Sequence, residues 1–388
     1  MVDNVIGRLR LMLIILAASA SAILFAAAFP DAILAGDALN YRDRMAELFS
    51  GKAPYVQFPF EHLPVMIFPM AAAWLLGGSE QLRTFAFALA GVSTVLLVGT
   101  GLMLRRVEAG FGITGLTVRW VLLTTPILPF LLFRNDAWVV FLTVGGILLV
   151  FRGRELASLL VLSLAAMAKV WPGLWAPVEW RRGKRVAAVA LLVATLASIA
   201  VVLSPALREA QNPKGLHTET VGGSLIGLGR SIEGHDLGLE RSTAVYIDAP
   251  GWLLAVNFLV GGLVALSAVR GLRAPFQWTR SWRLMGALTV ALIVSSPLFS
   301  TQYVAWVSPF AAVDKRTTAL MFPVSAISLV LLTTWHSLSE GAVWWWGLLV
   351  LRNALFILLG LYLGWSALPR ASRMLRDGRS NPSTEKGI

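Results

Sequence analysis

Long apolar runs separated by short polar clusters dominate this chain of 388 residues. Most runs approach the roughly 20 residues that a helix needs to cross the hydrocarbon core of a bilayer. Hydrophobic residues make up 57% and charged residues 14% of the chain, against about 45–50% and about 25% in soluble domains. The pattern predicts an all-α, polytopic integral membrane protein. The runs lie near residues 9–29, 63–78, 82–104, 117–133, 137–151, 156–178, 186–204, 251–269, 284–299, 302–313, 317–335 and 344–366.

The predicted number of crossings depends on two of these runs. Residues 63–78 are short and contain two prolines, so we expect a helix that lies in an outer loop or enters only part of the bilayer. Residues 156–178 are interrupted at Trp171-Pro172, and proline breaks a helix because its φ is fixed and it lacks an N–H. We therefore expect two short helices that turn there on the outer side. About twelve transmembrane helices result, with both termini cytoplasmic.

Charge and composition set the remaining topology. The formal net charge of +12 needs no nucleic acid partner, because Lys and Arg are enriched on the cytoplasmic side of membrane helices. The two largest outer loops are then residues 30–62 and 205–250. We expect residues 1–366 to form one transmembrane domain and residues 367–388 a polar, disordered cytoplasmic tail.

Several functional classes are excluded or disfavoured by residue content. The chain has no cysteine, which excludes disulfides, thiolate metal sites and a cysteine nucleophile. The four histidines show no metal-ligand spacing, so we expect neither a metal nor another cofactor. The first apolar run lacks a clear small-residue cleavage site, so we expect a retained helix and not a cleaved signal peptide.

Two aspartates at the outer face are candidates for function, because ionisable groups at membrane depth are costly. Asp37 directly precedes residues 38–49, whose apolar positions suit a short interfacial helix. It is therefore either a functional carboxylate or the N-cap of that helix. Asp136 follows Arg134 in a polar turn between two apolar runs, and it is equally either a site residue or the cap of the next helix.

Cationic and amide side chains are expected on the same face. Lys169 lies at least a dozen residues inside an apolar run, so its ammonium either reaches the outer water or has an anionic partner. Arg230 follows a glycine-rich stretch whose backbone N–H groups could approach an anion, with flexibility as the alternative reason for the glycines. Gln302 lies in a segment where serines and a proline interrupt a further run. A carboxylate beside cations in one outer cavity suits transfer chemistry on a lipid phosphate.

The order of these motifs resembles that of a known enzyme family. The first outer loop has an Asp four residues before a Tyr, then Gly-x-x-Pro-Tyr and an acidic-Pro segment. An Asp in the next outer turn, an Ala-x-x-Lys-x-x-Pro segment and a Ser-Pro-x-x-Ser-x-Gln-Tyr-x-x-Trp segment follow. Over residues 30 to 310 the chain resembles the bacterial GT-C glycosyltransferases that use polyprenyl-phosphate sugars, most closely the actinobacterial mannosyltransferases of phosphatidylinositol mannoside and lipomannan synthesis. The matching residues are Asp37, Tyr41, Gly51, Pro54, Tyr55, Glu61, Pro64, Asp136, Ala166, Lys169, Pro172, Ser296, Pro297, Ser300, Gln302, Tyr303 and Trp306.

The resemblance implies a GT-C-like fold with a catalytic first outer loop and an inverting sugar transfer at the outer face of the plasma membrane. The donor would be a polyprenyl-phosphate sugar, and the acceptor a hydroxyl of a glycolipid, a lipoglycan or another lipid-linked glycan. Asp37 would be the general base, and Lys169, Arg134 and Arg230 would bind the donor phosphate. The remaining substrate contacts would come from Tyr41, Tyr55, Glu61, His62, Asp136, Gln302 and Tyr303.

The chain departs from its relatives at two places. Many relatives have Glu-Tyr-Pro-Pro where this chain has Glu61-His62-Leu63-Pro64, and some have a His pair at Gln302-Tyr303. Mannose is the expected sugar and an arabinose donor is the alternative. A lipid-linked sugar transporter or flippase would share the buried lysine but would need a polar path through both leaflets. A non-catalytic membrane partner is a third interpretation.

Overall fold

The structure is a computed structural model that describes residues 2–28, 37–60, 62–77, 81–204, 216–241, 245–272 and 276–368. Most of this part of the chain is helical. The α-helices are α1 (Val2–Ala28), α3 (Leu39–Phe49), α4 (Ile67–Gly77), α5 (Leu82–Phe111), α6 (Leu116–Thr124), α7 (Leu128–Leu132), α8 (Asp136–Phe151), α9 (Glu155–Ala168), α10 (Ala176–Arg181), α11 (Arg185–Val202), α13 (Val221–Glu233), α14 (Trp252–Leu272), α15 (Trp278–Ser295), α16 (Val304–Ala311), α17 (Lys315–Thr333), α18 (His336–Ser339) and α19 (Val343–Ser366). Short 3₁₀ turns are η2 (Pro64–Met66), η3 (Thr125–Ile127), η4 (Trp171–Trp175) and η5 (Thr301–Tyr303).

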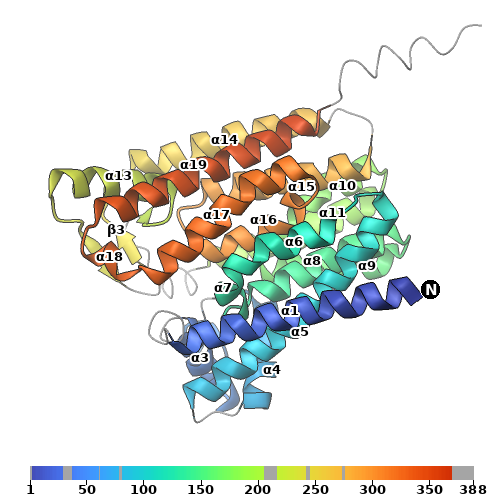
Figure 1. The fold of residues 1–388 in the computed structure, drawn as a ribbon, viewed down its shortest axis with the longest axis horizontal. Coiled ribbons are helices and arrows are strands. Elements are labelled where there is room, and N and C mark those ends of the chain that lie inside the picture. The colour runs from blue at the N-terminus through green and yellow to red at the C-terminus, as the bar shows by residue number, and fades with distance from the viewer. Residues whose placement is uncertain are drawn as a thin grey trace, which may run out of the picture.

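The long helices lie side by side in two groups (Figure 1). In the first group α5 packs on α1, α4 and α8, and α9 packs on α8 and α11. In the second group α19 packs on α14, α15 and α17. The short helix α16 contacts α6, α8, α15 and α17 and so joins the two groups. The N-terminus lies at one end of the bundle, and α3, α13 and β3 lie toward the other end.

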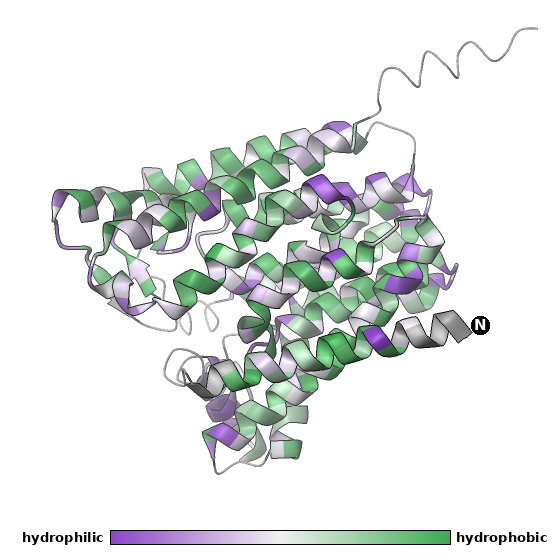
Figure 2. Ribbon diagram, in the orientation of Figure 1, coloured by the Kyte–Doolittle hydropathy of each residue, from purple (hydrophilic) through white to green (hydrophobic). Residues whose placement is uncertain are grey.

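The helices carry the surface expected of a membrane protein. Five of them, α5, α11, α14, α17 and α19, are long and apolar enough to cross a bilayer, and five further apolar segments have 10–17 residues. Hydrophobic residues cover most of the helix lengths, whereas hydrophilic residues gather toward the two ends (Figure 2). Large apolar side chains such as Leu75, Val95 and Val186 are exposed on this surface. The predicted membrane-protein class is confirmed, while the twelve crossings stay a prediction.

The two runs that decided the predicted topology differ in structure: residues 156–178 form a broken helix, whereas Pro64–Gly77 is one continuous apolar helix. Helix α9 ends at Ala168, Lys169 is extended (φ −151°, ψ 143°), and η4 and α10 follow. The helix is therefore interrupted at Lys169 and Val170, directly before the predicted position Trp171-Pro172, which begins η4. In the other run η2 and α4 cover Pro64–Gly77, with Pro64 at the first position of the turn, where proline needs no N–H partner.

The fold is all-α as predicted, with one small antiparallel sheet added to the helices. Its strands are β1 (Leu216–His217), β2 (Leu239–Arg241) and β3 (Val245–Ile247), in the order β1-β3-β2. His217 pairs with Tyr246 across β1 and β3. Strands of two or three residues are too short to produce an alternating pattern in the sequence. The sheet and α13 occupy the described part of the predicted outer loop 205–250, and most of the predicted tail 367–388 lies outside the described residues.

Arg119 and Asp314 form hydrogen bonds with the helix ends near the start of α17. Arg119 donates from Nε to the Ala312 carbonyl (2.7 Å) and from Nη2 to the Val313 carbonyl (3.0 Å), which caps the end of α16. Asp314 caps α17 in a capping box with Thr317. These side chains satisfy helix ends that would otherwise leave backbone groups unpaired.

Cysteine labelling tests which end of the bundle faces outward. The parent has no cysteine, and Lys52, which follows α3, and Lys184, which follows α10, are both exposed. Helices α3 and α10 lie toward opposite ends of the bundle (Figure 1). The surface pairs of these lysines with Glu47 and Glu155 contribute about 1 kcal/mol at most, so each substitution should leave the fold intact. We expect an impermeant thiol reagent to label Lys52→Cys in intact cells, and Lys184→Cys only after permeabilisation. Labelling of Lys184→Cys in intact cells contradicts the outer turn at Trp171-Pro172.

Candidate active site around Asp37 and Arg134

Four separate segments bring the predicted site residues together. They are the start of α3, the turn between α7 and α8, the break between α9 and η4, and η5 with the start of α16. Each segment is a helix end or a helix break, where side chains are not committed to packing along a bundle. The convergence follows from the alternation of the helices, because successive turns return to the same end of the bundle.

Asp37 forms an ion pair with Arg134. The distance from Asp37 Oδ2 to Arg134 Nε is 2.6 Å, and the two side chains are 27% and 25% exposed. The N-cap position of α3 is occupied by Ala38, with no side-chain capping hydrogen bond. The interpretation of Asp37 as an N-cap is therefore wrong, and its carboxylate instead connects α3 to the turn before α8.

Arg134 contacts a second predicted site residue through the same guanidinium. Its Nη1 donates to Ser300 Oγ (3.2 Å) and to Gln302 Oε1, and Ser300 also donates to Gln302. The guanidinium lies over the Phe130 ring, 5.5 Å from its centroid. Burial alone would lower the pKa of Arg134, but the charges of Asp37 and Asp136 raise it above the usual value. Arg134 therefore stays cationic.

Lys169 lies against aromatic rings. Its Nζ is 5.5 Å from the Tyr303 centroid and 5.7 Å from the Trp306 centroid, and these two rings stack at 4.0 Å. Such contacts stabilise a cation by about 0.5–2 kcal/mol. Within the described residues Lys169 forms no ion pair: ring faces lie against its ammonium, and the Asp136 carboxylate acts on it at longer range.

Asp136 completes this side of the site. It is buried, begins α8 and accepts a hydrogen bond from Trp306 Nε1 at 2.7 Å. The N-cap of α8 is Asn135, so the interpretation of Asp136 as the cap is wrong. Asp136 instead fixes the Trp306 ring that faces Lys169, while its charge acts on both Lys169 and Arg134.

The segment predicted as the first outer loop places its remaining candidates beside these groups. Tyr41 is buried in α3, and its ring meets the edge of His62 at 5.1 Å. Burial, followed by the charges of Lys169 and Arg44, lowers the pKa of His62 to about 3, so this imidazole is neutral. Tyr55 donates from its hydroxyl to the His62 carbonyl. Glu61 lies outside the described residues.

Arg230 does not join the described cluster. Its Nη1 donates to the Leu237 carbonyl at 2.9 Å, which closes the turn after α13. Within the described residues no contact connects this guanidinium to Lys169 or Arg134. The structure therefore groups two of the three predicted phosphate-binding cations and gives the third a local role.

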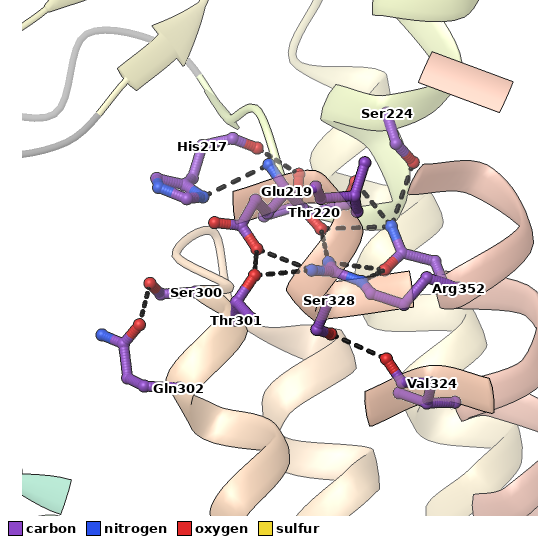
Figure 3. Close-up of polar contacts among 12 residues, drawn as sticks. His217, Glu219, Thr220, Ser224, Ser300, Thr301, Gln302, Val324, Ser328 and Arg352 are labelled. Atoms are coloured by element: carbon purple, nitrogen blue, oxygen red, sulfur yellow. Dashed lines mark hydrogen bonds and ion pairs between the residues drawn. The ribbon is translucent and has the colours of Figure 1, made fainter. Parts of the chain in front are cut away.

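A second ion pair was missed by the sequence analysis. Glu219 Oε2 accepts from Arg352 Nη1 at 2.6 Å and from the Thr301 hydroxyl, and both charged side chains are buried (Figure 3). Arg352 Nη1 also donates to Thr301 Oγ1 at 2.9 Å, and Asn353 donates to the Glu219 carbonyl at 3.1 Å. The signal was present, because Arg352 interrupts the last apolar run.

A cavity of about 80 Å³ lies between the two ion pairs. Its polar wall consists of Arg134, Glu219 and Thr301. Arg134 belongs to the ion pair with Asp37, Glu219 belongs to the ion pair with Arg352, and the Thr301 hydroxyl contacts this second pair. The apolar wall consists of Phe130, Leu331, Leu332, Trp335 and Trp345. The cavity is large enough for several water molecules.

No protein-family model and no curated protein matches this chain. Among the described residues, no group of three His, Asp or Glu side chains is arranged to hold a metal ion. The arrangement offers a carboxylate, two cations and a set of aromatic faces at one end of a membrane protein. A carboxylate can accept a proton, and the cations can stabilise an anion that forms during a reaction.

The buried histidine beside Glu219 predicts a loss of stability in acid. Burial lowers the pKa of His217 to about 4, with Glu219 opposing the shift and Arg352 increasing it. Since the unfolded chain binds this proton near pH 6.5, stability falls as the pH decreases from 6.5 to 4, by on the order of 3 kcal/mol. Thermal midpoints in detergent across this range should fall less steeply for His217→Gln than for the parent. The exposed His235→Gln control should keep the parental slope, and an unchanged slope in His217→Gln contradicts the assignment.

Proposed function

We propose that this protein transfers a sugar from a polyprenyl-phosphate donor to a hydroxyl of a lipid-linked glycan or glycolipid at the outer face of the plasma membrane. Mannose is the expected sugar, with arabinose as the alternative. The observation that carries the proposal is the ion pair of Asp37 with Arg134, together with Asp136, on which the charges of Asp37, Arg134 and Lys169 all act. A base and a cation pair are the minimum that an inverting transfer with a phosphate leaving group requires.

The proposed reaction assigns each charged group one task. The acceptor oxygen forms a bond to the anomeric carbon and loses its proton to the Asp37 carboxylate. The bond between the anomeric carbon and the phosphate oxygen breaks, and that oxygen keeps the electron pair. The leaving polyprenyl phosphate is already a stable anion, so it needs cations more than a proton donor. Lys169 and Arg134 supply these cations.

The Asp37–Arg134 pair fits a site that changes partners when substrate binds. In the structure Arg134 forms an ion pair with the Asp37 carboxylate, the group that would act as the base. A donor phosphate near Lys169 would compete for the same guanidinium, because Arg binds phosphate and carboxylate with similar geometry. Movement of Arg134 toward phosphate would free Asp37 for the acceptor. The base would then become available only when the donor is present.

Several buried polar atoms beside the proposed reacting groups could form hydrogen bonds with a polar substrate. Asn135 is buried and neither its amide nitrogen nor its amide oxygen has a partner in the described part of the chain. His62 Nε2 and Trp171 Nε1 also lack partners there. Buried polar atoms without hydrogen bonds cost about 1–3 kcal/mol each. A polar substrate in contact with them would recover that cost.

Asp37→Asn tests the base. Asparagine keeps the side-chain shape but cannot accept the proton, so we expect the transfer rate to fall by roughly 100-fold or more. The assay measures transfer of radiolabelled sugar from polyprenyl-phosphate mannose to a panel of lipid acceptors. Asp43→Asn is the matched control, because Asp43 is exposed on α3 and pairs with its neighbour Arg42. Near-parental turnover by Asp37→Asn would refute the role of Asp37.

Lys169→Met tests the phosphate cation. Methionine can keep contact with Tyr303 and Trp306 through its sulfur, so folding should be retained while donor binding weakens and acceptor binding changes little. Lys169→Arg should retain part of the activity, because the charge remains with a different shape. The matched control is Lys52→Met, which removes an exposed lysine. A Lys169→Met protein that melts early yet binds donor normally would assign Lys169 a structural role.

The transfer assay, combined with a measurement of donor movement across vesicles, separates transfer from transport. A flippase moves the lipid-linked sugar without breaking its bond to phosphate, so no labelled product forms from purified protein. Asp37, Arg134 and Lys169 all lie at helix ends or helix breaks and not along the length of a helix. Movement of labelled donor across vesicles without formation of glycosylated acceptor would favour the transporter.

A further inference from the structure

We infer that the cavity between the two ion pairs binds the hydroxyl groups of a sugar ring, an inference that rests on the proposed sugar transfer and adds a recognition site to it. The site consists of Arg134, Glu219 and Thr301 on one wall and Trp335, Trp345 and Phe130 on the other. Neither Glu219 nor the two tryptophans belongs to the motifs that suggested the reaction.

The Glu219 carboxylate is held with one oxygen available. Its Oε2 is occupied by Arg352 and Thr301, whereas no residue in the described ranges hydrogen-bonds to Oε1. In Figure 3 this second oxygen points away from Arg352, toward the side where Ser300 and Gln302 lie. Burial alone would raise the pKa of Glu219, but Arg352 and the hydrogen bonds lower it, so the oxygen is a charged acceptor.

A network of hydrogen bonds from Arg352 and Asn353 holds Glu219 in place. Arg352 Nη2 donates to the Glu219 carbonyl at 3.0 Å and to Asn353 Oδ1 at 2.9 Å. Asn353 in turn donates to Ser224 Oγ at 3.1 Å. A buried ion pair is often no more stabilising than an apolar replacement, so its presence in an apolar helix points to a task. Here it fixes the orientation of one free carboxylate oxygen beside Arg134.

The chemistry of the cavity fits a sugar better than an anion. Arg134 donates hydrogen bonds, Glu219 accepts them and Thr301 does both, which matches neighbouring sugar hydroxyls. Their charges balance, so the cavity has no excess positive charge to attract phosphate, unlike the surroundings of Lys169. The rings of Trp335 and Trp345 pack edge to face with their centroids 5.7 Å apart, and both residues form part of the apolar wall that would meet the C–H groups of a sugar. A few oriented polar groups in an aromatic-lined pocket are typical of small-molecule sites.

The position of the cavity connects it to the reacting groups. Arg134 lines the cavity and also holds Asp37, so a sugar in the cavity lies beside the proposed base. Both the donor sugar and the acceptor glycan present the required hydroxyls. The shared chemistry is therefore a sugar ring, and the experiment below separates the two sources.

Occlusion of the cavity is the direct test. Leu332 is half-buried and lines the apolar wall, so Leu332→Trp should fill the space without removing a polar group. Leu358→Trp, on the exposed face of α19, is the matched control. Trp335→Leu is a second variant that removes a ring without adding bulk. Thermal melting confirms that each variant is folded.

Sugar binding is measured by saturation-transfer NMR with methyl glycosides of mannose and arabinose. We expect the parent and Leu358→Trp to bind at least one of these glycosides, and both Leu332→Trp and Trp335→Leu to bind it roughly tenfold less tightly, as when contacts in a polar subsite are lost. Equal binding by the parent and folded Leu332→Trp overturns the inference. Absence of glycoside binding by the parent also overturns it.

Two further arms identify the source of the sugar and separate this inference from the proposed reaction. If the cavity holds the donor sugar, Leu332→Trp weakens binding of polyprenyl-phosphate mannose but not of polyprenyl phosphate. If it holds the acceptor, only binding of the glycolipid acceptor weakens. Lys169→Met should bind methyl glycosides as the parent does. Cavity-dependent glycoside binding together with full transfer activity in Asp37→Asn would leave the sugar site standing and remove the proposed catalytic assignment.

Discussion

A charged side chain inside an apolar helical bundle needs a partner, because removing an ion from water costs several kcal/mol. In the described part of the chain this requirement produces two ion pairs close to one cavity. Asp37 with Arg134 joins the start of α3 to the turn before α8, and Glu219 with Arg352 joins the sheet region to α19. Each pair connects elements from distant parts of the sequence, so the two pairs fix how the ends of the helices meet.

The 3₁₀ turn η5 connects the two ion pairs to Lys169. Such a turn has three residues per revolution, so three successive side chains point in directions about 120° apart. Thr301 contacts Glu219 and Arg352, Gln302 contacts Arg134, and the Tyr303 ring faces Lys169. A single turn of backbone thus presents one side chain to each charged group. A shift in any of these contacts would move the other two.

Much of the helical framework could be predicted from the sequence, because apolar length and proline-containing breaks act locally. The break at Lys169 and the turn before Asp136 are examples. The pairing of Asp37 with Arg134 could not be predicted, since it depends on how the two segments meet in space, and a helix cap was an alternative interpretation of each aspartate. Glu219 lies in a loop where carboxylates are ordinary. Arg352 could have been found, because the rule that singled out Lys169 applies equally to a charge within residues 344–366.

The distribution of neutralised and unneutralised charge divides the site into two environments. Arg134 and Arg352 each face a carboxylate, so their surroundings are polar with little net charge. Lys169 faces the rings of Tyr303 and Trp306, which stabilise a cation without cancelling its charge. An incoming anion therefore has its most favourable electrostatic interaction near Lys169. A neutral group with several hydroxyls instead forms its best hydrogen bonds in the cavity beside Glu219. Asp37 is held by Arg134, which also lines that cavity. A sugar linked to phosphate has one neutral and one anionic end, so these two environments would orient it with the phosphate toward Lys169 and the sugar toward Glu219.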